Sequence, residues 1–230
     1  MNASTATAVL VHGAWAGEAA WGKVANILHS EGIKTVTAHL PLSSLADDAA
    51  ALEKALEQVD GPVVLVGHAY AGAVISATQN SKVRALVYVA GIAPDQGETV
   101  AEVFNRYGHD AKTPELAPDG QGWIRLPADA FATAFAQHAT AEEQQMLAAT
   151  QPPISPAAIT VAAGAPLWKR VPSWYLLAEQ DHMIPAQTQR FVAERMQAHI
   201  VSYPVDHVPS VTAPALVANL IMDAIKHGKD

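Results

Sequence analysis

The sequence predicts an α/β fold: a doubly wound, mostly parallel sheet of six strands, with a helical cap inserted after the fourth strand. Short apolar runs without polar alternation are typical of parallel strands that are buried on both faces. Stretches with helical periodicity separate these runs, and the connections are short, as in repeated strand-helix-strand units. Residues 94–170 interrupt this alternation. A loop of that length is uncommon in a compact domain, which favours a helical insertion.

The composition limits the classes of function. The chain has 230 residues, half of them hydrophobic, which is enough for one buried core with a small insertion. A formal net charge of -8 without any lysine or arginine cluster argues against nucleic acid or an anionic membrane surface as the main partner. The chain has no cysteine, which excludes disulfides, thiolate catalysis and cysteine-ligated zinc.

The N-terminus and the apolar segments give expectations about location. Residues 1–7 are uncharged and lack the basic and apolar regions of a signal peptide. No apolar run reaches the roughly 18 residues that a membrane span needs. We therefore expect a soluble cytoplasmic protein whose partner is a small molecule, with no nucleic-acid or membrane partner. A homodimer is kept open as its assembly state.

The first predicted strand is the continuous apolar run at residues 6–11, which ends at a histidine-glycine pair. A helix over residues 21–30 follows, because apolar residues recur there at helical spacing and a glycine stands just after the last turn. The apolar stretch at residues 34–40 predicts the second strand.

The third and central strand is the apolar run at residues 63–66. An amphipathic helix over residues 47–59 precedes it, with leucines on the inward face and charged residues on the outward face. A helix rich in small residues follows at residues 71–79, and residues 83–90 predict the fourth strand.

Prolines punctuate residues 94–170, and helical pieces are predicted between them at residues 98–107, 128–138 and 141–149. Regular alternation then resumes, with strands at residues 172–178 and 199–204 and helices at residues 186–197 and 214–227. The chain therefore divides into an α/β core, residues 1–93 and 171–230, and a cap, residues 94–170.

The most informative stretch is the turn after the central strand, because ligand sites in open parallel sheets form at the carboxyl ends of strands. Gly67 and Gly72 flank this turn and let a helix begin very close to the strand. It predicts a nucleophile elbow, in which G-x-S-x-G holds a serine on a strained corner. Here the middle position is Ala69, which has no oxygen for an attack. An ordinary turn with small residues for packing is the alternative, and Ala73 replaces the lysine of a phosphate loop.

Two further strand ends carry reactive side chains, Asp181 and His207. A hydroxyl at position 69 would need an imidazole to remove its proton, and the imidazole would need a carboxylate to fix its tautomer. We predict His207 and Asp181 for these roles. Glu179 is an alternative acid, and Asp181 could instead cap the following helix. Asp206 is interpreted as a turn residue, because adjacent side chains diverge.

The loop after the first strand, His12-Gly13-Ala14-Trp15, supplies a fourth feature. We predict that the backbone N–H groups of Ala14 and Tyr70 face the developing oxyanion, where one such donor is worth roughly 2.7 to 4 kcal/mol. His12 is expected to hold the loop in place.

The candidate substrate-binding residues are Trp15, His68, Trp123 and Met183. A structural role is the alternative for His68, and an approach of the Tyr70 side chain to the pocket is left open. The apolar cap residues together predict an apolar lid: Trp123, Phe131, Phe135, Met146, Leu147 and Trp168. The histidines lack metal-ligand spacing, so neither a metal nor a cofactor is predicted.

Four motifs in order, V-L-V-H-G-A-W, V-G-H-A-Y-A-G, D-H-M-I-P and D-H-V-P, carry a resemblance over nearly the whole chain. The chain resembles the α/β-hydrolase fold superfamily, in its small-capped branch with bacterial esterases, plant methyl-ester esterases and hydroxynitrile lyases. The chain order nucleophile, acid, histidine agrees with this resemblance. The family pattern has serine where this chain has Ala69.

The resulting hypothesis is a serine-type hydrolase scaffold for a small to medium, mainly apolar ester or lactone. Ala69 is interpreted as a deliberate replacement of serine that holds substrate uncleaved, because His207, Asp181 and the glycines all remain; natural decay is the alternative. A second hypothesis is a lyase or cofactor-free dioxygenase that uses the His207–Asp181 pair without a serine. A third is a non-catalytic module that binds a small molecule.

Overall fold

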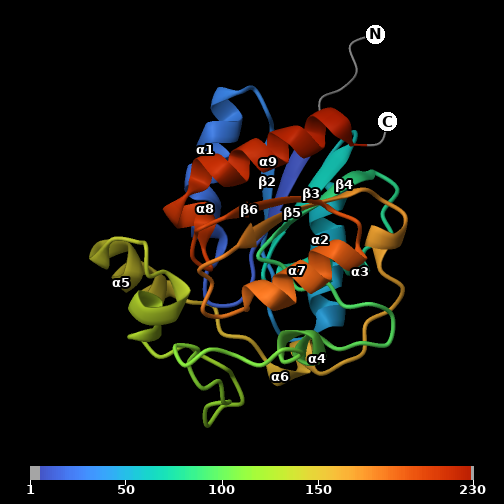
Figure 1. The fold of residues 1–230 in the computed structure, drawn as a ribbon. Helices are drawn as coiled ribbons and strands as arrows, with labels where there is room; N and C mark the ends of the chain where they lie inside the picture. Colours follow the sequence, from blue (N-terminus) through green and yellow to red (C-terminus); the bar gives the residue numbers. More distant parts are fainter. Residues whose placement is uncertain (1–5, 229–230) are drawn as a thin grey trace.

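The computed structural model describes residues 6–228 and contains one sheet of six parallel strands in the order β2-β1-β3-β4-β5-β6 (Figure 1). The predicted doubly wound α/β fold is therefore confirmed. The strand bounds are β1 Thr7–Val11, β2 Thr35–Ala38, β3 Val63–His68, β4 Val83–Val89, β5 Ser173–Ala178 and β6 His199–Tyr203. Strand β2 is shorter than the predicted run of residues 34–40, because only its residues 35–38 pair with β1.

Helices cover both faces of the sheet, and alternate strand residues point into two separate cores. Ala8 and Leu10 of β1 pack with α1 (Gly22–Ser30) and α9 (Pro214–His227) on one face. Val9 and Val11 belong to the core on the other face, which is covered by α2 (Leu45–Glu57), α3 (Ala71–Ala77) and α7 (Ala186–Arg195). The short elements η1 (Glu18–Trp21) and α8 (Pro209–Thr212) lie against α1.

Residues 94–170, the cap segment, contribute only short helices: α4 (Val100–Phe104), η2 (Phe131–Phe135), α5 (Ala141–Thr150), α6 (Pro156–Ile159) and η3 (Leu167–Lys169). In Figure 1, α4 and α6 lie together at one end of the molecule and α5 lies at its outer edge. Capping boxes begin α4 and α5, with Thr99–Glu102 and Thr140–Glu143 as the paired residues.

Two predicted cap helices are much shorter in the structure. The stretch at residues 98–107 forms a helix only between its cap at Thr99 and Asn105, and the chain turns at Gly108, which has a φ of 72°. The stretch at residues 128–138 forms a single π-helical turn. Isolated bridges join Ile124 to Pro118 and to Ile154, so part of the cap segment is extended. Within residues 6–228, no helix is long and apolar enough to cross a membrane.

The strand order indicates where in the sheet a ligand site is expected. After β1 the chain passes to β2 on one side and then to β3 on the other, so β1 pairs with both. The order in which strands are added to the sheet therefore reverses between β1 and β3, although all strands stay parallel. Crevices at such a switch point, at the carboxyl ends of the strands, are where α/β sheets bind ligands.

Candidate active site

The turn after β3 has the geometry of a strained strand-to-helix corner. Ala69 has a φ of 49°, in the left-handed region that a residue with a side chain rarely adopts. A Cβ on Gly67 would lie 2.8 Å from the carbonyl oxygen of Ala71, and one on Gly72 would lie 2.5 Å from that of Ile92. Both positions therefore require glycine, whereas Ala71 occupies the second glycine position of G-x-S-x-G. The side chain of residue 69 lines a cavity.

His207 reaches the same cavity from the loop after β6, and Asp181 lies behind it in the turn after β5. Nδ1 of His207 and Oδ2 of Asp181 are 2.7 Å apart, and the two side chains are 2% and 0% exposed. Because an ionised carboxylate only accepts hydrogen bonds, Nδ1 carries the proton in neutral His207 and Nε2 keeps its lone pair. The pair thus has the arrangement of a general base with its orienting acid.

The other candidate acids do not contact the imidazole. Glu179 is exposed and accepts a hydrogen bond from the hydroxyl of Ser202. Asp206 is fully buried, but its carboxylate accepts from the backbone N–H groups of His138 and Val208 and from the hydroxyl of Thr212. It therefore stabilises the loop that carries His207. Asp181 does not cap α7, whose N-cap residue is Pro185.

Two residues predicted as backbone donors come from different strand ends, Ala14 from the loop after β1 and Tyr70 from the turn after β3. Both line the cavity, and within residues 6–228 neither N–H group donates to a protein acceptor. His12 holds the loop, with Nδ1 2.9 Å from the carbonyl oxygen of Gly13 and Nε2 accepting from the N–H of Leu40. Burial lowers the pKa of His12, which keeps the imidazole neutral as this bonding requires.

Trp15 connects this loop to the cap segment. Its backbone N–H donates to the carbonyl oxygen of Pro152, and its indole N–H donates to that of Ile124. Trp15 has a φ of 65° and lines the cavity. The position of the predicted donor Ala14 is therefore coupled to the position of the cap.

Tyr70 lines the cavity, but its hydroxyl group is bonded to a residue of α2. It donates to Oδ2 of Asp48 over 2.5 Å, and the other carboxylate oxygen accepts from the N–H of Leu42. Burial, and then the neighbouring Asp48, raise the pKa of Tyr70 well above its usual value. The phenol is therefore a fixed donor that anchors the elbow to α2.

His68 was predicted to bind substrate, and the structure places it outside the cavity lining. Its side chain is buried, and Nε2 lies 2.6 Å from the backbone carbonyl oxygen of His207. Burial, and secondly His207, lower the pKa of His68 to about 3, so the ring is neutral and donates this hydrogen bond. The alternative structural role describes this residue better.

The cavity has a volume of about 340 Å³, and its walls are mainly apolar. Met183 lines it as predicted, but Trp123 does not. Trp123 precedes Ile124, which faces the cavity, and neighbouring side chains of an extended segment point to opposite sides. The apolar wall of the cap segment consists of Val100, Ala101, Phe104, Pro114, Leu116, Ile124, Ile154 and Ile159.

None of the apolar residues predicted as a lid lines this cavity. Phe131 and Phe135 are buried in the core, and the Phe135 ring contacts the His207 ring edge-on at a centroid distance of 5.0 Å. Trp168 lies against Arg195, and Met146 is 60% exposed. An apolar roof is present, but aliphatic side chains and Phe104 form it.

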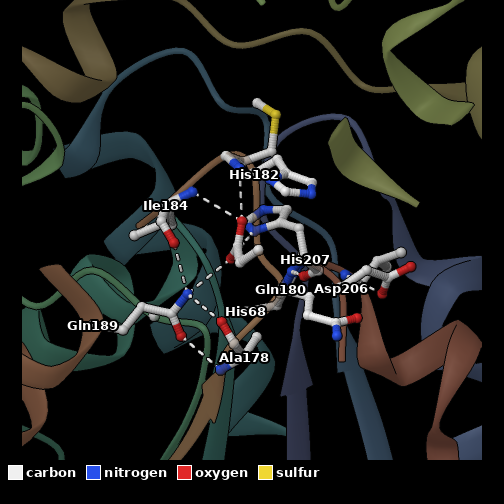
Figure 2. A network of polar contacts seen from close by, with 12 residues as sticks. His68, Ala178, Gln180, His182, Ile184, Gln189, Asp206 and His207 are labelled. Atoms are coloured by element: carbon white, nitrogen blue, oxygen red, sulfur yellow. Dashed lines mark hydrogen bonds and ion pairs between the residues drawn. The ribbon is translucent and has the colours of Figure 1, made fainter. Parts of the chain in front are cut away.

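Sequence reasoning missed two residues that hold the site, Gln189 and Asp48. Figure 2 shows Gln189 in a network with Ala178 and Ile184, and its side-chain nitrogen also donates to Oδ2 of Asp181. Both residues are polar and lie on helices with inward apolar faces. A polar side chain at such an inward position is the signal that could have found them.

Comparisons with known proteins agree with the fold. Residues 8–220 match a family described as "Alpha/beta hydrolase family". Norfluorocurarine synthase 2 from Strychnos sp is 24% identical, over 94% of this chain and 93% of its own length. Methylesterase 8 from Arabidopsis thaliana is 23% identical, over 93% of this chain and 87% of its own length. The crystal structure of polyneuridine aldehyde esterase superposes with a TM-score of 0.82 at 18% identity, covering 96% of this chain and 99% of that one.

Proposed function

The chain belongs to the alpha/beta hydrolase family, and from this premise we propose a serine-type ester hydrolase scaffold with residue 69 at the nucleophile position. Its substrate is a small to medium, mainly apolar ester or lactone, which suits the apolar cavity. The observation that carries the proposal is the meeting of three strand ends at one cavity. Ala69 stands there on a positive-φ turn, His207 is bonded to buried Asp181, and Ala14 lines the cavity with an N–H group that has no protein acceptor among the described residues.

With serine at position 69, each group has a defined step. His207 takes the hydroxyl proton through Nε2 while the serine oxygen attacks the ester carbonyl carbon, and the N–H groups of Ala14 and Tyr70 stabilise the oxyanion. The tetrahedral intermediate expels the alcohol, which receives the proton from His207. Water then attacks the acyl-enzyme while His207 takes one of its protons. When the second tetrahedral intermediate collapses, His207 returns this proton to the serine oxygen and the carboxylic acid leaves. Asp181 remains ionised throughout.

Ala69 has no lone pair and no acidic proton, so this chain forms no acyl-enzyme at that position. We propose that alanine stands where the hydrolytic form has serine, and that this chain binds an ester without cleaving it. Removal of the nucleophile from a related triad costs about 10⁶-fold in turnover. Esterase activity of the unchanged chain is expected to be near background.

The direct test is Ala69→Ser. We expect a burst of p-nitrophenol from short and medium p-nitrophenyl esters, followed by steady hydrolysis, because the added oxygen would face the imidazole. The matched control is Ala69→Ser combined with His207→Ala, which keeps the hydroxyl and removes its base. Neither a burst nor steady hydrolysis across several acyl lengths, in a folded Ala69→Ser protein, would refute the proposal.

A second candidate function uses the His207–Asp181 pair without a serine, as a lyase or a cofactor-free dioxygenase would. His207 lines the cavity, and among the described residues no hydroxyl is bonded to its Nε2, so this nitrogen is available as a base. The Strychnos relative is named a synthase, not an esterase. Activity of the unchanged chain that is lost in His207→Ala would favour this function.

The third candidate is a non-catalytic binding module on the same fold. Ligand affinity that His207→Ala leaves unchanged, together with no turnover in Ala69→Ser, would favour it. These two variants therefore separate all three candidates.

A further inference from the structure

Gln189 lies on α7, away from the cavity, and its side chain is fully buried. Its oxygen accepts a hydrogen bond from the N–H of Ala178 at 2.9 Å. Its nitrogen donates to the carbonyl oxygen of Ile184 at 2.8 Å and to Oδ2 of Asp181 at 2.9 Å. The nitrogen also lies 3.5 Å from the carbonyl oxygen of Ala178, so the amide oxygen faces an N–H donor and the amide nitrogen faces oxygen acceptors only. One orientation of the amide satisfies these contacts (Figure 2).

Gln189 completes the hydrogen bonding of a buried carboxylate. The N–H groups of Met183 and Ile184 donate to Oδ1 of Asp181 at 2.7 and 2.9 Å, and His207 and Gln189 donate to Oδ2 at 2.7 and 2.9 Å. An ionised carboxylate offers about four acceptor sites, and here four donors fill them. Without Gln189, the oxygen that faces the imidazole would have His207 as its one donor among the described residues.

We infer that Gln189 is a positioning residue of this site: its amide holds the carboxylate oxygen that faces His207 and stabilises that carboxylate as the anion. The consequence for catalysis rests on the proposed function, whereas the structural claim concerns only the pair. Gln189 touches neither the cavity nor the reacting atoms, so its effect passes through Asp181.

The direction of the effect follows from which species gains the hydrogen bond. The amide stabilises the pair most when the carboxylate carries an uncompensated charge, that is, when His207 is neutral. Loss of the amide makes uptake of a proton by the pair more favourable, whichever of the two residues holds it. The pair should then take up its proton at a higher pH. The other titratable groups around it, His68, Tyr175 and Asp206, stay in place.

The test is Gln189→Met in the otherwise unchanged chain, followed by an NMR titration of the His207 ring. Methionine has a similar volume and no donor. We expect the midpoint of the titration to rise by about one pH unit, a tenfold change in proton affinity. The matched control is Thr188→Val on the same helix. Thr188 is fully buried, and its hydroxyl has no hydrogen-bond partner within the described residues. The control midpoint should match that of the parent.

Gln189→Glu provides a second variant, should the methionine variant fail to fold. It keeps the shape of the side chain and brings a second carboxylate against Asp181, which should raise the midpoint further. A midpoint that is unchanged or lowered in the folded variants would overturn the inference and leave Gln189 with a packing role only.

The titration and the esterase assay test separate claims, so each claim can be refuted without the other. If Ala69→Ser is inactive, the proposed hydrolase is refuted, but the titration of the unchanged chain still tests the role of Gln189. If Ala69→Ser is active, adding Gln189→Met should move the acid limb of its kcat/KM profile upward by the same amount. An unmoved limb with an unmoved midpoint would overturn the inference alone.

Discussion

The floor and the roof of the cavity are built on different principles. The floor consists of the turns after β1, β3, β5 and β6, and it supplies every group to which we assign a chemical role. The roof is the cap segment, residues 94–170, and its contribution is mainly apolar wall. The floor is held by parallel strands and by buried polar bonds such as those of Asp181. The roof contains only short helices and isolated bridges.

This difference indicates which properties each region controls. Groups that move protons need positions fixed to a fraction of an ångström, and strand ends in a closely packed sheet provide them. An apolar wall needs only volume and shape, so irregular segments suffice. We therefore expect changes in the floor to alter the reaction and changes in the roof to alter the choice of substrate. Hydrogen bonds join the two regions, among them those of Trp15 and Asp206.

The largest effect should separate two histidines that line the same cavity, His207 from the floor and His109 from the roof. In the Ala69→Ser background, His207→Ala should lower kcat/KM by at least about 10³-fold, because the serine loses its base. His109→Ala should change kcat/KM less than about tenfold, mainly through KM. Steady-state hydrolysis of a p-nitrophenyl ester measures both.

Equal losses in the two variants would contradict the division between floor and roof. Loss in His109→Ala alone would transfer the role of base to the cap. Circular dichroism of each variant shows whether the comparison is made between folded proteins.

The second effect concerns the pH dependence of stability. Burial lowers the pKa of His68 to about 3 in the folded state, against about 6.5 when unfolded. Its contribution to stability is therefore complete above pH 6.5 and is lost as the pH falls from 6.5 toward 3, by at most about 1.4 kcal/mol per pH unit. His68→Gln cannot titrate and should flatten the slope of unfolding free energy between pH 7 and pH 4.

Urea unfolding at several pH values measures this slope. His39, whose side chain is 73% exposed, provides the control, and His39→Gln should leave the slope of the parent unchanged. A slope in His68→Gln as steep as in the parent would mean that His68 is not kept neutral in the folded protein.

The third effect tests a bond between floor and roof. The buried Asp206 accepts from the backbone N–H of His138 in the cap segment and from two donors in its own loop. Asp206→Asn turns an N–H group toward at least one of these donors and should lower the free energy of unfolding by about 1 to 3 kcal/mol. Urea unfolding at neutral pH measures it.

Glu179 is the matched control, since it is an acid near the same strand ends but exposed. Glu179→Gln should change the free energy of unfolding by less than about 0.5 kcal/mol. A difference of that size or smaller in Asp206→Asn would show that the buried carboxylate does not hold the two regions together.

The same division explains how much the sequence could predict. Ala69, Asp181 and His207 each follow a strand closely, so a parallel sheet is sufficient to bring them to one rim, and their meeting was predicted. The role of His68 was harder to predict. It is adjacent to Ala69 in the sequence, but its side chain lies in the core and not in the cavity lining. Its hydrogen bond to the backbone of His207 joins residues 139 positions apart, which no local pattern reveals.

For the roof, the sequence could predict the apolar character of the wall but not the individual residues that form it. Its apolar composition indicates an apolar wall, but the choice between Trp123 and its neighbour Ile124 depends on a bridge to Ile154, thirty positions later. Two of the predicted cap helices, at residues 98–107 and 128–138, were too long because helical spacing does not show where tertiary contacts end. Gln189 was missed because a polar residue on an amphipathic helix is normally placed on its exposed face.

The smallest effect should come from one aliphatic side chain of the roof. Ile159 on α6 lines the cavity, and Ile159→Ala removes three carbon atoms from the wall. In the Ala69→Ser background we expect the ratio of kcat/KM values for a longer and a shorter acyl ester to shift about tenfold toward the longer one, with kcat nearly unchanged. One or two methylene groups in an apolar pocket change the discrimination between substrates by about this factor.

Val161, two residues along and 54% exposed, does not line the cavity, so Val161→Ala is the control and should leave the ratio unchanged. A tenfold fall in kcat without a change in the ratio would show that the roof sets the positions of the reacting groups after all, and the difference between the two regions would then be one of architecture alone.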